Sequence, residues 1–146
     1  MVYQLPRTLI AETFGHVSAC GRRAEECQVL WVSPWAEPSA ISAVVHTKHR
    51  SHAAGFDVET GWLSWLWNDL AARHLGIRVQ VHTHPRRAFH SATDDRWPII
   101  HLPGFLSLVI PNFGMREPGF RGAYLAEIDN DGRWREVSVS ERIKVE

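Results

Sequence analysis

The chain has 146 residues, 45% of them hydrophobic, so it is long enough to bury a core as one domain spanning residues 1–146. Its 16 basic and 16 acidic residues cancel, and this balance gives no reason to expect a nucleic-acid or membrane partner. No apolar run approaches the roughly 20 residues that cross a bilayer, and the N-terminus lacks the pattern of a signal peptide, so we expect a cytoplasmic protein.

The first half of the chain predicts a helix, a hairpin and a longer helix. Apolar residues recur at helical spacing in 5–19. Two short, β-rich runs at 27–33 and 40–46 flank a turn with two prolines, which predicts paired strands. The polar segment 47–56 is expected to be a loop, and 56–76 is expected to be the longest helix, ending at its final glycine.

The second half of the chain predicts mainly strands. Segment 77–84 alternates apolar and polar residues, and 104–114 contains an apolar strand that a proline closes. Segment 122–139 predicts two strands around an Asp-Gly turn. The order of elements predicts an α/β (α+β) fold, a single domain in which helices flank a mixed β-sheet.

The segment VHTHPRRAFHSATDD, residues 81–95, concentrates side chains that bind metals. His82 and His84 are two positions apart at the end of a predicted strand, so both point to the same face. A proline then ends the strand, and Ser91 is a good helix N-cap with Asp94 three positions later on the same side. Two imidazoles and one carboxylate leave the fourth position of a tetrahedral Zn²⁺ open, which is typical of a catalytic zinc site.

The pattern HTHP…HSATD resembles the JAMM motif of the JAB/MPN zinc metalloproteases, which hydrolyse isopeptide bonds to ubiquitin and ubiquitin-like proteins. The resemblance covers about residues 5–140. It is most similar to the prokaryotic JAB peptidases of bacterial ubiquitin-like conjugation systems, because FHSATDD is followed by PGFLSLVIPNFG. It implies a JAB1/MPN-like fold and one Zn²⁺ per chain. It also implies, as partners, a ubiquitin-like protein and its conjugates, together with E1-like and E2-like proteins of the same system.

The same resemblance implies that His82, His84 and Asp94 are zinc ligands, and that Ser91 stabilises the oxyanion of the transition state. One departure affects the third ligand. The family usually has seven residues between the second histidine and the serine, and this chain has six. The Ser-x-x-Asp pairing favours Asp94, because both side chains project from one helical turn. The distance from His84 favours Asp95, which stays an alternative.

The resemblance further implies a glutamate that acts as general base at the start of a strand following the first helix. The stretch RRAEECQVLWVS offers Glu25 and Glu26. Ser33 lies seven positions after Glu26, where the family often has a glycine. We therefore favour Glu26 as the base and keep Glu25 as the alternative.

The remaining cysteines and histidines give weaker signals. Cys20 and Cys27 are seven positions apart, which fits neither a disulfide framework nor a zinc knuckle, so we expect both to be reduced and buried. His46, His49 and His52 follow a predicted strand and are candidates for a second metal site, although no carboxylate accompanies them.

The leading functional hypothesis is a zinc-dependent isopeptidase or peptidase that cleaves after the C-terminus of a ubiquitin-like protein, in deconjugation or precursor maturation. Three alternatives are a non-catalytic scaffold of the same fold, a JAMM hydrolase that removes a small amino-acid adduct from a carrier protein, and an Fe(II) oxygenase. The presence of ligands, serine and candidate base argues against the scaffold. The strand–loop–helix context argues against the oxygenase.

Overall fold

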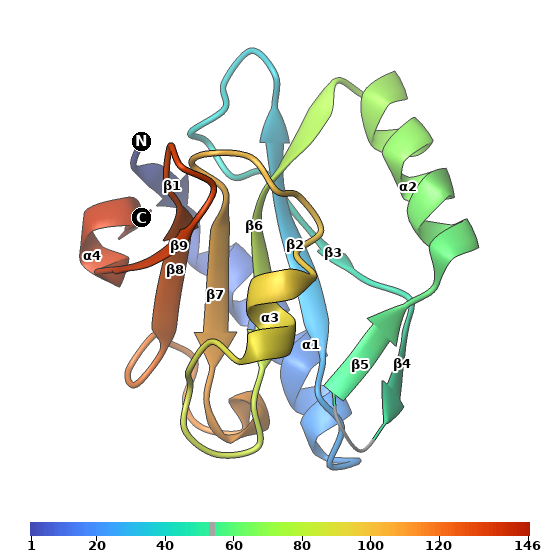
Figure 1. Ribbon diagram of the computed structural model, residues 1–146, viewed down its shortest axis with the longest axis vertical. Coiled ribbons are helices and arrows are strands. Elements are labelled where there is room, and N and C mark those ends of the chain that lie inside the picture. Colours follow the sequence, from blue (N-terminus) through green and yellow to red (C-terminus); the bar gives the residue numbers. More distant parts are fainter. Residues whose placement is uncertain (53–54) are drawn as a thin grey trace.

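The computed structural model describes residues 1–52 and 55–146 (Figure 1). In chain order, the elements are β1 (Tyr3–Leu5), α1 (Arg7–Gly21), β2 (Gln28–Pro34), β3 (Ala43–His46), β4 (His49–His52), β5 (Gly55–Val58), α2 (Thr60–Ala72), β6 (Leu75–Thr83), α3 (Ala92–Arg96), β7 (Leu106–Ile110), η1 (Asn112–Gly114), β8 (Tyr124–Ile128), β9 (Trp134–Val137), α4 (Val139–Arg142) and β10 (Ile143–Val145).

A six-stranded sheet in the order β3-β2-β6-β7-β8-β9 forms the centre of the molecule. Strands β6 and β7 are parallel and the other neighbours are antiparallel, so the predicted mixed sheet flanked by helices is confirmed. The connection from β6 to β7 contains α3, and the histidine-rich segment 81–95 runs from the end of β6 into this crossover. The short strands β1 and β10 pair in parallel and bring the two ends of the chain together.

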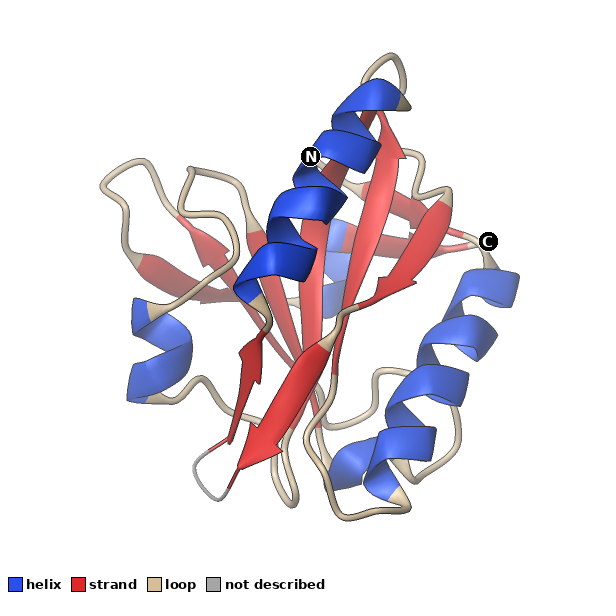
Figure 2. Ribbon diagram, turned by 90° about the vertical axis from the view of Figure 1, so that its right-hand side faces the viewer, coloured by secondary structure: helices blue, strands red, loops and turns tan. Residues whose placement is uncertain are grey.

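Two hydrophobic cores lie on opposite faces of the sheet. Because side chains alternate along β2, Val29 and Trp31 pack in the core that contains α1. Leu30 and Val32 pack with Leu66 and the rest of the buried face of α2. Figure 2 shows α1 and α3 on opposite sides of the sheet. With both faces covered, β2 has the continuous apolar sequence that predicted it as a buried strand.

The prediction of a loop over 47–56 is wrong. Strands β4 and β5 form an antiparallel ribbon there, with His49 opposite Val58. Residues 53–54, within the same predicted loop, lie outside the described residues. The ribbon is supported by a contact between the rings of Phe56 and His49, whose centroids are 5.6 Å apart. Such cross-strand pairs stabilise a hairpin without leaving an apolar alternation in the sequence.

The two predicted helices exist with different ends. The first begins at Arg7, because residues 3–5 form β1. The second spans Thr60–Ala72, since β5 occupies the start of the predicted range and the chain takes a left-handed turn at His74 (φ +54°) before Gly76. None of the helices in the described ranges has the length and apolar character needed to cross a bilayer. The hairpin predicted within 122–139 is confirmed as β8 and β9.

Candidate metal centre

Strand β6 and the residues that directly follow it bring two histidines into a cavity. His82 and His84 are only 2% and 6% exposed. Thr83, between them, points to the other face, where its hydroxyl accepts the backbone N–H of Cys27 at 3.0 Å. The backbone N–H of Thr83 in turn donates to the carbonyl of Cys27 at 3.1 Å. These two bonds fix the end of β6 against the start of β2, so the strand pairing itself orients the imidazoles.

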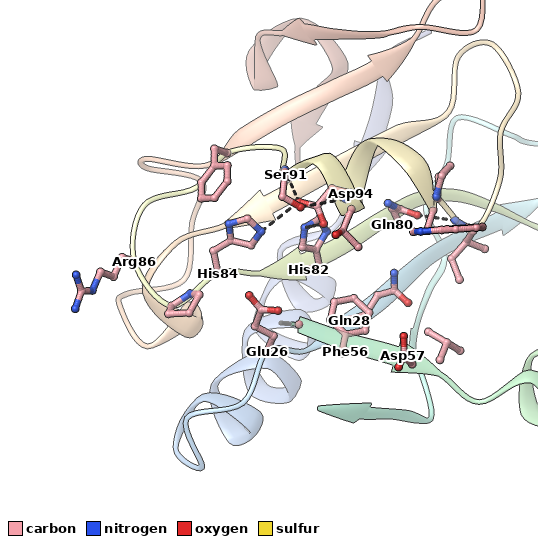
Figure 3. A pocket seen from close by; sticks show the side chains of 18 of the residues that line it. Glu26, Gln28, Phe56, Asp57, Gln80, His82, His84, Arg86, Ser91 and Asp94 are labelled. Carbon is pink, nitrogen blue, oxygen red and sulfur yellow. Dashed lines mark hydrogen bonds and ion pairs between the residues drawn. The ribbon is translucent and has the colours of Figure 1, made fainter. Parts of the chain in front are cut away.

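Helix α3 brings a carboxylate back to the two imidazoles. Ser91 is its N-cap: the Ser91 hydroxyl accepts the N–H of Asp94 at 3.0 Å, and Asp94 Oδ2 accepts the N–H of Ser91 at 2.8 Å. The predicted helix start is therefore confirmed. The capping box turns the Asp94 carboxylate toward β6, where Oδ1 lies 3.2 Å from His82 Nε2 and Oδ2 lies 3.3 Å from His84 Nε2 (Figure 3).

The electrostatics of this group suit a bound cation. Burial alone would raise the pKa of Asp94, but the two histidines and the N–H of Ser91 outweigh it and hold the pKa far below its usual range. Nε2 of His82 is buried and, within the described ranges, makes no hydrogen bond of acceptable geometry despite its approach to Asp94. A metal ion bound between this nitrogen and the ionised carboxylate would supply the partner that the buried nitrogen needs.

The two candidate aspartates face different partners. Asp95 Oδ1 instead lies 2.6 Å from His90 Nδ1. Nε2 of His90 lies 3.1 Å from the hydroxyl of Ser107. The His90 ring also packs edge-on against Trp134, with centroids 4.6 Å apart. The structure thus brings Asp94 to the two imidazoles and uses Asp95 to hold a largely buried histidine.

The two candidate glutamates also separate. Glu26 lines the cavity, and Figure 3 shows its carboxylate directed toward the histidines from the side opposite Asp94. Glu25 instead lies 3.5 Å from the guanidinium of Arg23, with 39% of its side chain exposed. Of these two glutamates, Glu26 lines the cavity and Glu25 does not.

The cavity has a volume of about 1070 Å³ and lies between the β4–β5 ribbon and α3. Phe56 of β5 and Trp97 after α3 both line it, and Arg86 lies in the loop that follows β6. The ring of Phe56 is 6.1 Å from that of His82, so β5 reaches the metal-binding group directly. The cavity lining combines these apolar side chains with the histidines and carboxylates described above, a mixture that is common in ligand-binding sites.

Sequence reasoning missed Gln28 and Phe56. Gln28 lies opposite His82 in the β2–β6 register and is 4% exposed, and its Oε1 has no hydrogen-bond partner in the described part of the chain. A glutamine at the start of an otherwise apolar strand was the available signal. Phe56 had no such signal, because it was assigned to a loop.

Comparison with known proteins finds a relative of this chain. A protein of Sinorhizobium fredii named probable metalloprotease y4jG is 34% identical over 140 residues, which cover 91% of this chain and 85% of the relative. No protein-family model matches the chain.

Solved structures share the fold at low identity. A protein from Desulfitobacterium hafniense superposes with a TM-score of 0.68 at 16% identity, over 100% of this chain and 93% of that chain. A JAB1/MPN domain protein from Archaeoglobus fulgidus superposes with a TM-score of 0.52 at 9% identity, over 98% of each chain. The fold is therefore JAB1/MPN-like, as expected.

Proposed function

Because this chain belongs to the family of the probable metalloprotease of Sinorhizobium fredii and has a JAB1/MPN-like fold, we propose that it is a zinc-dependent peptidase of the JAMM type. The observation that carries the proposal is the convergence of His82, His84 and Asp94, from one connected segment, in a cavity that Glu26 also lines. Three protein ligands leave one position of a tetrahedral ion open, which is typical of catalytic rather than structural zinc.

A Zn²⁺ held by His82, His84 and Asp94 would supply Lewis acidity at the scissile carbonyl and would lower the pKa of a bound water to about 7. The chain's own residues then handle the proton. Glu26 accepts a proton from the attacking water and delivers it to the departing amine. Its position across from Asp94 supports this role, because the carboxylate faces the cavity without competing for the place of the third ligand.

Ser91 supplies a hydrogen-bond donor to the oxyanion of the transition state. The Ser91 Oγ accepts a hydrogen bond from the N–H of Asp94, and its hydroxyl hydrogen is available to donate to the oxyanion. Ser91 also lines the cavity. A donor fixed in this way before the reaction stabilises the developing negative charge without reorganisation.

We further propose that the substrate is the C-terminal tail of a ubiquitin-like protein, cleaved in an isopeptide conjugate or a precursor. This matches the prokaryotic JAB peptidases that work beside E1-like and E2-like proteins. Strand β5 borders the cavity through Gly55–Val58. An extended tail would add beside it as a strand through main-chain hydrogen bonds, which require little side-chain identity. At about 1070 Å³, the cavity admits a tail and excludes a folded domain.

The test is cleavage of a ubiquitin-like fusion by purified, zinc-loaded protein. Glu26→Ala should lower kcat by about 10²- to 10⁴-fold, the usual contribution of a general base, with zinc retained. Glu25→Ala is the matched control, since Glu25 pairs with Arg23, and it should keep wild-type activity. Full activity of Glu26→Ala would exclude Glu26 as the base. A wild-type protein without stoichiometric zinc would instead indicate a scaffold of the same fold.

A further inference from the structure

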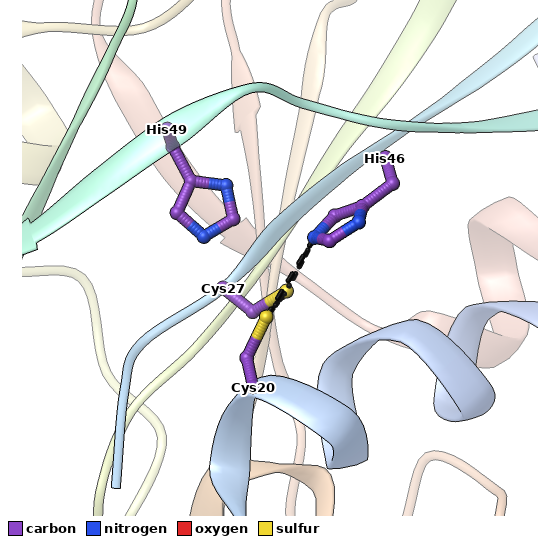
Figure 4. A group of neighbouring side chains, drawn as sticks. All are labelled: Cys20, Cys27, His46 and His49. Atoms are coloured by element: carbon purple, nitrogen blue, oxygen red, sulfur yellow. Dashed lines mark hydrogen bonds between the residues drawn. The ribbon is translucent and has the colours of Figure 1, made fainter. Parts of the chain in front are cut away.

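Four metal-binding side chains gather outside this cavity, where α1, β2, β3 and β4 meet (Figure 4). Cys20 lies in the last turn of α1 and Cys27 directly precedes β2, while His46 ends β3 and His49 begins β4. One ligand atom from each lies within 4.8 Å of the others. We propose that these four residues form a second, structural Zn²⁺ site.

The distances fit a tetrahedral ion. Nε2 of His46 lies 3.2 Å from the sulfur of Cys27 and 3.6 Å from that of Cys20. Zn–S bonds of about 2.3 Å and Zn–N bonds of about 2.0 Å would place sulfur and nitrogen roughly 3.5 Å apart. The two sulfurs are 2.8 Å apart and would separate to roughly 3.8 Å around the same ion. Rotation of the two cysteine side chains would have to widen their separation by roughly 1 Å.

The orientation of His49 fits a metal ligand. Its Nδ1 lies 2.9 Å from the carbonyl oxygen of Thr47. A carbonyl oxygen only accepts, so Nδ1 donates and Nε2 keeps its lone pair. Thr47 is 3% exposed, and its hydroxyl donates to the carbonyl of Gln28 at 3.1 Å. Zinc-bound histidines usually have their second nitrogen held in this way.

The composition of the group indicates a structural role. Two cysteines and two histidines complete four ligands and leave no position for substrate. Two thiolates also balance the charge of Zn²⁺, which matters because Cys20 and Cys27 are 1% and 0% exposed. A disulfide between the cysteines would use the sulfurs, but it would give no role to the two histidines that converge on them.

The position of the site suggests what it stabilises. An ion here would tie α1 to the start of β2, the end of β3 and the β4–β5 ribbon. Cys27 directly follows Glu26, and His49 begins the ribbon that borders the cavity. The ion would therefore fix the backbone beside the proposed base. This consequence rests on the proposed peptidase function, whereas the metal site itself does not.

Cobalt substitution tests the proposal. Reduced, metal-free protein should bind two Co²⁺ per chain and show the thiolate-to-cobalt charge-transfer band. Asp94→Asn should lose one equivalent and keep the band, because His82, His84 and Asp94 include no sulfur. Cys27→Ser should lose the band. His49→Gln keeps both thiols and tests the site even if Cys27→Ser does not fold; it should weaken binding of the band-forming ion by at least about 10-fold.

Two results would overturn the proposal: wild-type protein that binds cobalt without the charge-transfer band, or protein purified with reductant and zinc whose mass shows a Cys20–Cys27 disulfide. If His49→Gln bound the band-forming cobalt ion as tightly as the wild type does, His49 would not be a ligand and the four-ligand assignment would be wrong. If Asp94→Asn kept both equivalents, the retained band would support this site, while the zinc ligands of the proposed peptidase would be wrong.

Discussion

At the scale of single residues, Asp94 and Asp95 show how adjacent acids take different tasks. The spacing of the motif left the choice open, because this chain has one residue fewer than the family between histidine and serine. The capping box settles the geometry, since the same hydrogen bonds that start α3 at Ser91 turn Asp94 toward the histidines. Local helix chemistry was therefore a better guide than the distance along the chain.

We predict that Asp94→Asn and Asp95→Asn differ in zinc binding. Asp94→Asn removes the carboxylate charge 3.2 Å from His82 Nε2 and should lower zinc affinity by more than about 100-fold. This loss is larger than the roughly 10- to 100-fold loss that is usual when a residue hydrogen-bonded to a metal ligand is replaced. Asp95→Asn disturbs only the contact with His90 and should change affinity by less than about 10-fold. Competition with a chromophoric chelator measures both. Equal losses in the two variants would contradict the placement of Asp94 as the ligand.

At the scale of elements, long strongly patterned segments were predictable and the short paired ones were not. The apolar runs of β2 and β7 predict strands, as does the alternation of apolar and polar residues in β6, and the Asp-Gly turn predicts the hairpin of β8 and β9. The β4–β5 ribbon could not be predicted in this way, because its short segments show no apolar alternation and its side chains make contacts, such as Phe56 with His82, that are distant in the sequence. The sequence named His46 and His49 as candidates for a second metal site but did not join them to Cys20 and Cys27, since separate elements supply the four residues. The side chain of His52, the third histidine considered there, lies outside the described residues.

The turn η1 is an element whose backbone restricts its sequence. Gly114 has φ +67°, a left-handed conformation, and a Cβ there would overlap Cγ2 of Val17 in α1. Gly114→Ala should therefore lower the free energy of unfolding by about 2 kcal/mol or more, through backbone strain and overpacking. Urea denaturation measures this change.

Gly15 is the matched control for that substitution. It lies in the exposed middle of α1, where an added Cβ meets nothing within 4 Å. Gly15→Ala should raise the free energy of unfolding by about 0.5–1 kcal/mol, because alanine loses less conformational entropy in a helix. Similar effects of the two substitutions would show that η1 does not require glycine.

At the scale of the whole molecule, the N-terminal and C-terminal strands β1 and β10 pair with each other, away from the candidate metal centre. Tyr3 pairs with Ile143 in the β1–β10 ribbon, and both are buried in the α1 core. Strands of three residues are too short to show periodicity, so this closure could not be predicted from the sequence. The class of fold could, because it depends on the longer elements and on covering both faces of one sheet.

An ion pair couples this closing segment to the central sheet, and its contribution should depend on pH. Glu127 of β8 accepts bonds of 2.8 and 3.3 Å from Arg142 of α4, and these are the main cause that lowers the pKa of Glu127 below its usual 4.5. Because the folded state holds the carboxylate ionised more strongly than the unfolded chain does, the stabilisation is complete above about pH 4.5 and declines as the pH falls through the folded-state pKa.

Glu127→Gln should accordingly lower the free energy of unfolding by about 1 kcal/mol at pH 7, since both side chains are only partly exposed. The difference from the wild type should shrink at pH 3. Urea denaturation at both pH values, with a chelator present so that metal release does not contribute, measures it. Glu136→Gln, at an exposed position of β9, makes the same change of charge and should alter the stability by less than about 0.5 kcal/mol. A loss from Glu127→Gln that is equal at the two pH values would mean that the packing of the side chain, and not its charge, holds the C-terminal segment to the sheet.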